Sequence, residues 1–291
     1  LASLSVTQWQ CAQRRFARHL SEDRAALAAQ FGLPKTGPVC AVSTGLSDRH
    51  HGGLTVIRTE FADGNTVYYK PRGMALESRA ADLMSQLDPG LKSMVPAVLS
   101  RDDHGWAKEV VANPGDPEPY YYQAGKVVFA AWVFAGTDLH DENVLPSSQG
   151  PVVIDAEMLA SPLPLFENGP AAGKPGKSLY NRAEDNTVLR SSLLPSWESY
   201  GNDTLVQISG MSAGKQYQTG LKTSGWSQIN TDRMALKSEW VCVENATQIA
   251  SLPEPSDYAN AVIEGFQSLV DPARALAAPP AWHNALATQL A

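Results

Sequence analysis

Gly136-Thr137-Asp138-Leu139-His140-Asp141-Glu142-Asn143 and, shortly after it, Val152-Val153-Ile154-Asp155-Ala156-Glu157 are the two stretches that decide the fold. The residues between them predict two short strands joined by a turn of Ser, Gln and Gly. Such a hairpin folds back on itself, so Asp155 returns to the side of Asn143. Glu157 lies on the same side as Asp155, because side chains two apart on a strand share a face. An amide and a carboxylate at the base of a hairpin offer the oxygen ligands that Mg²⁺ prefers.

The spacing within the first stretch predicts phosphoryl transfer. Asp138 and Asn143 are five residues apart, as are the Asp and Asn of the kinase catalytic loop H-R-D-x-x-x-x-N. In such a loop the Asp orients or deprotonates the hydroxyl nucleophile, while the Asn and a later Asp hold metal against the phosphates. The alternative is a solvated acidic loop after a buried helix. The strand, turn, strand and Asp-x-Glu that follow favour the kinase-type site.

A kinase also needs a cation for the nucleotide phosphates, and Lys70 is the candidate. Strands are expected at residues 54–59 and 66–70, because the turn Ala62-Asp63-Gly64-Asn65 separates them. A helix is expected at residues 75–87, where apolar residues recur at helical spacing. A Lys on a hairpin strand followed by a helix is where a kinase lobe keeps its phosphate-binding Lys. Either Glu77 or Asp82 on the helix is a candidate partner for it, and a Lys on an exposed edge strand is the alternative.

A Gly-rich segment, Ser47-Asp48-Arg49-His50-His51-Gly52-Gly53, precedes the first expected strand. Its backbone is able to approach phosphates. Asp48, His50 and His51 are also open to interpretation as a metal cluster, although no zinc-ligand spacing accompanies them. The sequence contains neither a G-x-x-x-x-G-K-[ST] motif nor a G-x-G-x-x-G before a helix, so P-loop and dinucleotide folds have no support.

Composition and charge exclude several classes of protein. The 291 residues include 23 Lys and Arg against 30 Asp and Glu, which gives a net charge of −7. An acidic chain is a poor candidate for binding nucleic acid or anionic lipid. No apolar run approaches the roughly 20 residues that span a bilayer, and no signal peptide is expected. Three cysteines without CxxC spacing favour a reducing, cytoplasmic location over a disulfide scaffold.

Taken along the chain, the pattern predicts an α+β protein with a β-rich front part and a helical back part. The remaining expected helices lie near residues 6–20, 22–31, 126–134 and 258–270. Two stretches rich in Pro and Gly are expected to be loops, at residues 113–122 and 162–177. The first of these loops sets the predicted boundary between residues 1–115 and residues 116–291.

These residues resemble the dehydratase domain of class II lanthipeptide synthetases, the LanM type. The resemblance is carried first by residues 136–143, by Val-Val-Ile-Asp-x-Glu and by Tyr69-Lys-Pro-Arg72. Further stretches match in the same order, from about Leu46 to about Phe266. They are Asp48–Gly53, His104-Gly105-Trp106, Val188–Pro195, Ile208-Ser209-Gly210, Asn230-Thr231-Asp232 and Gly265-Phe266.

The resemblance implies a lipid-kinase-like fold with a β-rich N-terminal lobe and a mainly helical C-terminal lobe. It implies ATP- and Mg²⁺-dependent phosphorylation of Ser and Thr in a precursor peptide, made of a leader and a Ser/Thr-rich core. Phosphate elimination is the family's second reaction, and a separate cyclase is a further implied partner. The family's zinc-binding cyclase domain has no counterpart in this sequence. The family also uses an Arg and a Thr for elimination, and these two residues cannot be placed in this sequence.

The resemblance also implies roles for individual residues. Asp138 is the catalytic base or orienting residue, and His140 supports it. The metal ligands are Asn143 and Asp155, whereas Lys70 and Glu157 lie at the nucleotide. Asp48 and His50 belong to the elimination chemistry.

Two other functions stay open at the level of sequence. One is a small-molecule kinase on the same scaffold, which the matching motifs outside the site disfavour. The other is a catalytically inactive peptide-binding module, which the presence of Asp138, Asn143, Asp155 and Lys70 together disfavours.

Overall fold

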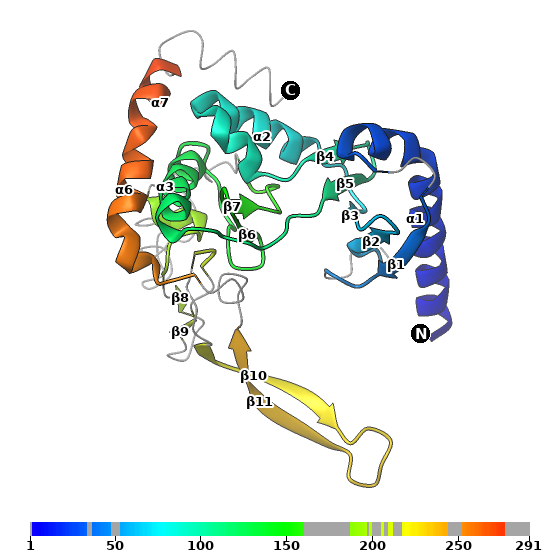
Figure 1. Ribbon diagram of the computed structural model, residues 1–291. Helices are drawn as coiled ribbons and strands as arrows, with labels where there is room; N and C mark the ends of the chain where they lie inside the picture. The colour runs from blue at the N-terminus through cyan, green and yellow to red at the C-terminus, as the bar shows by residue number, and fades with distance from the viewer. Residues whose placement is uncertain are drawn as a thin grey trace, which may run out of the picture.

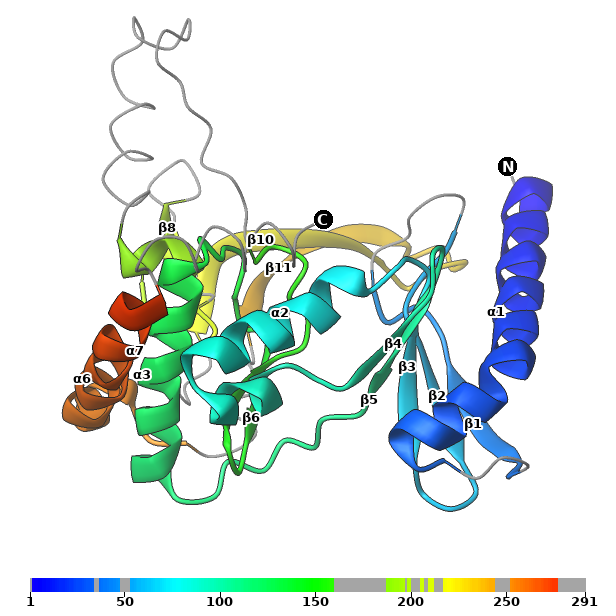
Figure 2. The same ribbon diagram turned by 90° about the horizontal axis from the view of Figure 1, so that it is seen from above.

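The computed structural model describes residues 2–33, 37–47, 53–159, 187–196, 198–199, 205–206, 209–211, 217–243 and 252–276. The chain forms two lobes (Figure 1). One lobe holds a five-stranded sheet with helix α1, and the other gathers α2, α3, α6 and α7. Seen from above, α1 and the α3–α6–α7 group lie at opposite ends, with the sheet and α2 between them (Figure 2). The predicted α+β class, with a β-rich front lobe and a helical back lobe, is confirmed.

The sheet is antiparallel throughout, in the order β1-β2-β3-β5-β4. Its strands are β1 (Val39–Ser43), β2 (Ile57–Phe61), β3 (Thr66–Lys70), β4 (Val98–Ser100) and β5 (Gly105–Lys108). The predicted hairpin is confirmed as β2–β3. Along β3, Val67 and Tyr69 pack into the core under α1, while Tyr68 packs with the residues of the opposite face. Lys70 therefore leaves the sheet on the face opposite α1, which is the face toward α2.

Helix α1 (Ala2–Phe31) is continuous, whereas the sequence predicted two helices. Ser21 and Glu22 lie at the expected break, and neither residue interrupts a helix as Pro or Gly does. From its middle to its C-terminal end, α1 buries Phe16, Leu27 and Phe31 against the sheet, in the same cluster as Trp106. This packing covers one face of the sheet and leaves the other face for α2.

The larger core lies in the second lobe. Helix α2 (Ala75–Leu87) has the predicted bounds, and the 3₁₀ helix η1 (Pro89–Met94) follows it. The buried side of α2 joins the core around α3 (Pro117–Val133), together with η3 (Val188–Ser191), η4 (Pro255–Tyr258), α6 (Ala259–Ser268) and α7 (Val270–Leu276). Thus α2 is continuous with the sheet in sequence but packs mainly into the core of the second lobe. The boundary near residue 115 stays a prediction.

Helices α3 and α6 cross at two glycines. A Cβ on Gly125 would lie 2.0 Å from the carbonyl oxygen of Val262, and one on Gly265 would lie 1.9 Å from that of Tyr122. Only glycine allows two helix backbones to approach this closely. The Gly265-Phe266 motif therefore has a structural reason, since Phe266 also packs edge-on against Phe129 of α3 at 4.9 Å between ring centroids.

Three hairpins complete the second lobe. Strands β6 (Val144–Ser147) and β7 (Gly150–Val153) form the predicted one, and β8 (Glu198–Ser199) with β9 (Leu205–Val206) is short. The third, β10 (Tyr217–Ser227) with β11 (Ala235–Val243), was not predicted and projects away from the lobe (Figure 1). Its turn carries the Asn230-Thr231-Asp232 motif.

The loop prediction at residues 113–122 is partly wrong, because α3 begins at Pro117. Asp116 caps this helix by accepting a hydrogen bond from the Glu118 N–H, and proline fits the first turn of a helix, where no N–H donor is needed. The loop predicted at residues 162–177 lies outside the described residues. Within the described part of the chain, no helix is both long and apolar enough to cross a membrane.

Candidate active site

Lys70 stands at the junction of the two lobes. Its Nζ lies 3.1 Å from Asp155 Oδ2, which follows β7, and 4.0 Å from Glu77 Oε1 in the first turn of α2. The ammonium also donates to the carbonyl oxygen of Ile154 at 3.2 Å. The Lys70 side chain is 10% exposed and the Glu77 side chain only 1%. A strand Lys facing a Glu on the next helix and a metal-binding Asp is the arrangement found in protein kinases.

The structure distinguishes between the two candidate partners of Lys70. Glu77 faces the site, whereas Asp82 points away and pairs with Lys92 at 3.0 Å on the surface. The separation of five residues, about one and a half helical turns, places the two carboxylates on different sides of α2.

Arg72 is a site residue to which the sequence assigned no role. One guanidinium nitrogen, Nη2, lies 2.7 Å from Glu77 Oε1, 2.8 Å from Asp155 Oδ1 and 3.0 Å from Glu157 Oε2. Burial alone would lower the pKa of Arg72, but the nearby charges of Glu77, Asp155 and Glu157 raise it above its ordinary value. Pro71 and Arg72 directly follow the candidate Lys, so proximity in sequence was the available signal.

The candidate catalytic loop, residues 136–143, places Asp138, His140 and Asn143 together. The Asn143 side-chain amide donates to the backbone carbonyl oxygen of Asp138 at 2.8 Å and lies 3.1 Å from His140 Nε2. His140 Nε2 is 3.6 Å from Asp138 Oδ1. A side-chain hydrogen bond with Asp141 and the charge of Asp138 raise the pKa of His140, against the lowering effect of burial. The His140 imidazole therefore keeps its proton to a higher pH than a free histidine does.

Asp138 has an unusual backbone, with φ of 64° in the left-handed region. Residues other than glycine seldom adopt this conformation, although Asp tolerates it better than most. The side chain is 56% exposed, so the carboxylate is open to a substrate hydroxyl.

Residues of two of the matching motifs contact the backbone of this loop. Leu139 N–H donates to the carbonyl oxygen of Ser191 at 2.9 Å, and His140 forms an isolated bridge with Ser209. A Cβ on Gly210 would lie 2.4 Å from the carbonyl oxygen of Leu139, so glycine is required there. Ser191 of the Val188–Pro195 stretch and the Ser209-Gly210 pair therefore hold the backbone of the candidate catalytic loop.

Asn143 and Asp155 flank the base of the β6–β7 hairpin. The Ile154 N–H donates to the carbonyl oxygen of Asn143 at 2.9 Å, which fixes the two segments side by side. Because the Asn143 amide nitrogen is engaged with Asp138, the Oδ1 atom is the free acceptor of that side chain. This oxygen, with the carboxylates of Asp155 and Glu157, is the type of donor set that suits Mg²⁺, so the residues fit the predicted metal.

Asp48 and His50 lie outside the described residues. The two flanks of their segment are tied together, because Gly45 N–H donates to Thr55 Oγ1 at 3.1 Å and Val56 N–H donates to Ser47 Oγ at 3.0 Å. The segment connects β1 to β2. Their assignment to elimination chemistry stays a prediction.

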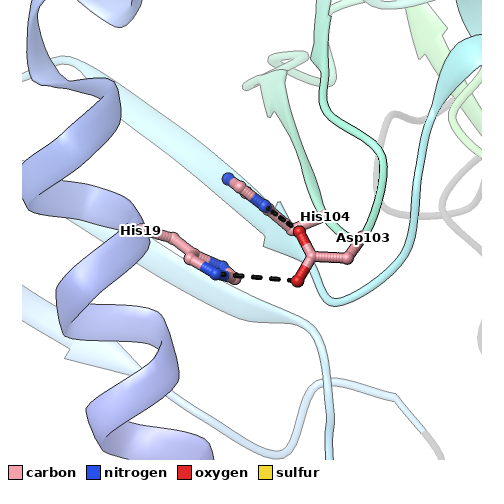
Figure 3. Close-up of side chains that lie close together, drawn as sticks. All are labelled: His19, Asp103 and His104. Carbon is pink, nitrogen blue, oxygen red and sulfur yellow. Dashed lines mark hydrogen bonds and ion pairs between the residues drawn. The ribbon is translucent and has the colours of Figure 1, made fainter.

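A second polar cluster joins α1 to the turn between β4 and β5 (Figure 3). His104 is held between two carboxylates, with Nε2 2.7 Å from Asp23 Oδ2 and Nδ1 2.8 Å from Asp103 Oδ1. The Trp106 indole also donates to Asp23 Oδ2 at 2.8 Å. Burial would raise the pKa of Asp23, but hydrogen bonds from His104, Trp106 and Arg101 lower it. The His104-Gly105-Trp106 motif thus attaches the sheet to α1.

His19 completes this cluster without making it a metal site. Its ring stacks on His104 at 3.7 Å between centroids with planes 15° apart, and its Nδ1 lies 3.0 Å from the Tyr69 hydroxyl. Nitrogen lone pairs lie in the ring plane, so two rings stacked face to face do not both point at one ion. Both His104 nitrogens already face carboxylates. We interpret the cluster as the attachment of α1.

Comparison with known proteins shows a family match and a likeness to solved structures. The sequence matches the family described as Domain of unknown function (DUF4135) over residues 1–279. Among curated proteins nothing matches. A crystal structure from Thermobifida fusca YX-ER1, provisionally assigned as a fructosamine-3-kinase, is 17% identical, with 92% of this chain and 89% of that chain covered. Its TM-score of 0.27 is too low to establish a shared fold. Because the family match covers nearly the whole sequence, the chain belongs to the DUF4135 family.

Proposed function

We propose that the chain transfers a phosphoryl group from MgATP to a hydroxyl group. The observation that carries this proposal is the position of Lys70, within 3.1 Å of Asp155 and 4.0 Å of Glu77 at the lobe junction. In this proposal Lys70 binds nucleotide phosphates, and Asn143 and Asp155 would hold the magnesium that neutralises their charge. The exposed Asp138 orients or deprotonates the attacking hydroxyl, and His140 keeps that carboxylate in place.

We propose further that the hydroxyl belongs to Ser or Thr of a lanthipeptide-type precursor peptide. The matching motifs support this substrate, and the DUF4135 domain occurs in lanthipeptide synthetase-like proteins. Several of these motifs lie outside the transfer site, at the turn of β10–β11 and at the crossing of α3 and α6. Phosphate elimination is a second proposed step on the same peptide.

The test is incubation of the chain with ATP, Mg²⁺ and a precursor peptide, followed by intact mass analysis. A mass gain of one HPO₃ per site shows phosphorylation, and a loss of one water per site shows that elimination follows. We expect phosphopeptide as the first product. An unchanged peptide, with phosphorylation instead of small hydroxylated metabolites supplied alongside it, would overturn the peptide assignment in favour of a small-molecule kinase. No ATP-dependent product from either substrate would overturn phosphoryl transfer.

A further inference from the structure

The carboxylates at the lobe junction are short of hydrogen-bond donors. Arg72 Nη2 carries two protons but lies within 3.0 Å of three carboxylates. Asp155 receives an aligned hydrogen bond from it at 2.8 Å. Glu77 lies slightly closer to the same nitrogen, at 2.7 Å, yet neither of its oxygens has an aligned donor among the described residues. Glu77 is therefore a buried carboxylate that points into the site without a hydrogen bond.

The formal charge of this group is also unbalanced. Lys70 and Arg72 contribute two positive charges, and Glu77, Asp155 and Glu157 contribute three negative ones, so the sum is −1. Glu77 is buried, and a buried carboxylate without full compensation is unfavourable, which makes the group attractive to a further cation. However, Arg72 already occupies one oxygen of Asp155 and Lys70 the other. A divalent ion that binds Asp155 therefore competes with these two cations for the carboxylate.

Arg72 is the cation better able to leave. Its side chain is 34% exposed against 10% for Lys70, and Glu157, on its outer side, is 48% exposed. A guanidinium also binds phosphate oxygens well, through its fixed fork of N–H donors. MgATP brings both a metal for the carboxylates and phosphates for the guanidinium.

We propose that Arg72 is an exchangeable counter-ion, which holds Asp155 and Glu157 in the nucleotide-free site and turns to the phosphates when MgATP binds. While Arg72 is paired with Asp155, the metal alone binds with low affinity. Metal and nucleotide therefore bind cooperatively. This inference rests on the proposed function, and it assigns Arg72 the role of a positioning residue rather than a catalytic one.

The test uses Mn²⁺, whose binding is measured by electron paramagnetic resonance, without and with a non-hydrolysable ATP analogue. Arg72→Gln should bind Mn²⁺ alone at least about fivefold more tightly than the wild type, because its competitor is gone. The same variant should gain less Mn²⁺ affinity from the analogue. Arg72→Met, which keeps the apolar stem, serves if the Gln variant does not fold. The matched control is Arg58→Gln, since Arg58 also pairs with two glutamates but lies on β2.

Each outcome separates this inference from the proposed function. Tighter Mn²⁺ binding with a smaller nucleotide effect supports the exchange. Unchanged or weaker Mn²⁺ binding by both Arg72 variants would overturn it, because Arg72 would then be a fixed part of the metal site or outside it. If the wild type binds no Mn²⁺ even with the analogue, the proposed phosphoryl transfer fails as well.

Discussion

Lys70 and Asp155 form an ion pair of 3.1 Å although one belongs to the sheet lobe and the other to the hairpin of the second lobe. Asp155 is thereby bound on one oxygen by Lys70 and on the other by Arg72. The candidate metal ligand is thus held between two cations from a single short segment at the end of β3. The first two predictions test the partners of this pair.

Asp155→Asn should lower ATP-dependent activity by about two orders of magnitude or more, because it removes the charge that holds the metal at the phosphates. The chain should still fold, since Glu77 and Glu157 remain to balance Lys70 and Arg72. Steady-state phosphorylation rates and a thermal melt check both points. Asp82→Asn is the control, because Asp82 lies on α2 but pairs with Lys92 on the surface. Full activity in Asp155→Asn would contradict the proposed kinase activity.

Lys70→Met should raise KM for ATP by about 10- to 100-fold, the range expected for losing a charged hydrogen bond to phosphate. Methionine keeps most of the apolar stem, so folding should be retained. The control is Lys92→Met, which removes an exposed Lys with a similar carboxylate partner. Unchanged ATP kinetics in Lys70→Met would show that another cation serves the phosphates.

The attachment of α1 should weaken in mild acid. Burial, and then the neighbouring His104, lower the pKa of His19. Just below about pH 6.5 the unfolded chain therefore binds more protons at this residue than the folded chain does, so the free energy of unfolding falls as the pH falls. His19→Gln should flatten this decline in denaturant titrations between about pH 8 and pH 5.

His140→Gln is the informative counterpart. Because the pKa of His140 is raised, this residue stabilises the folded state below about pH 6.5 and loses that effect as the pH rises through its folded pKa. Its replacement should make the acid decline steeper, opposite to His19→Gln. If the free energy of unfolding falls equally with pH in the wild type, His19→Gln and His140→Gln, the pKa directions given for His19 and His140 are wrong.

Gly265→Ala should destabilise the chain by about 2–3 kcal/mol, because the new Cβ would overlap the carbonyl oxygen of Tyr122 and force α3 and α6 apart. Chemical denaturation measures the change. Gly225→Ala is the matched control, since a Cβ there meets no atom within 4 Å. Equal stability of the two variants would show that the helix crossing tolerates the larger separation.

Local patterns were sufficient for the elements that carry the site. Strand β3, helix α2 and the β6–β7 hairpin have the predicted positions because apolar spacing and turn residues specify them directly. Lys70, Asn143 and Asp155 follow from those elements. Their roles stay predictions, and so do those of Asp48 and His50.

Other features depend on partners that are distant in sequence. Strands β4 and β5 are only three and four residues long, and they are defined by pairing with each other and with β3. Arg72 has a recognisable role only once Glu77 and Glu157 surround it, since three residues of different elements are needed to make that cluster. The start of α3 at Pro117 was missed because proline indicates a loop as readily as a first helical turn.

Helix α2 connects the geometry of the site to the orientation of the lobes. Its first turn carries Glu77 beside Lys70, while Leu83, Met84 and Leu87 are anchored in the core of the second lobe. A tilt of the sheet relative to that core would change the 4.0 Å separation between Lys70 Nζ and Glu77 Oε1, because Lys70 belongs to the sheet and α2 is anchored in the second core. That single interatomic distance would therefore report any such tilt, and a pair of spectroscopic labels on α1 and α6 would detect it from outside the site.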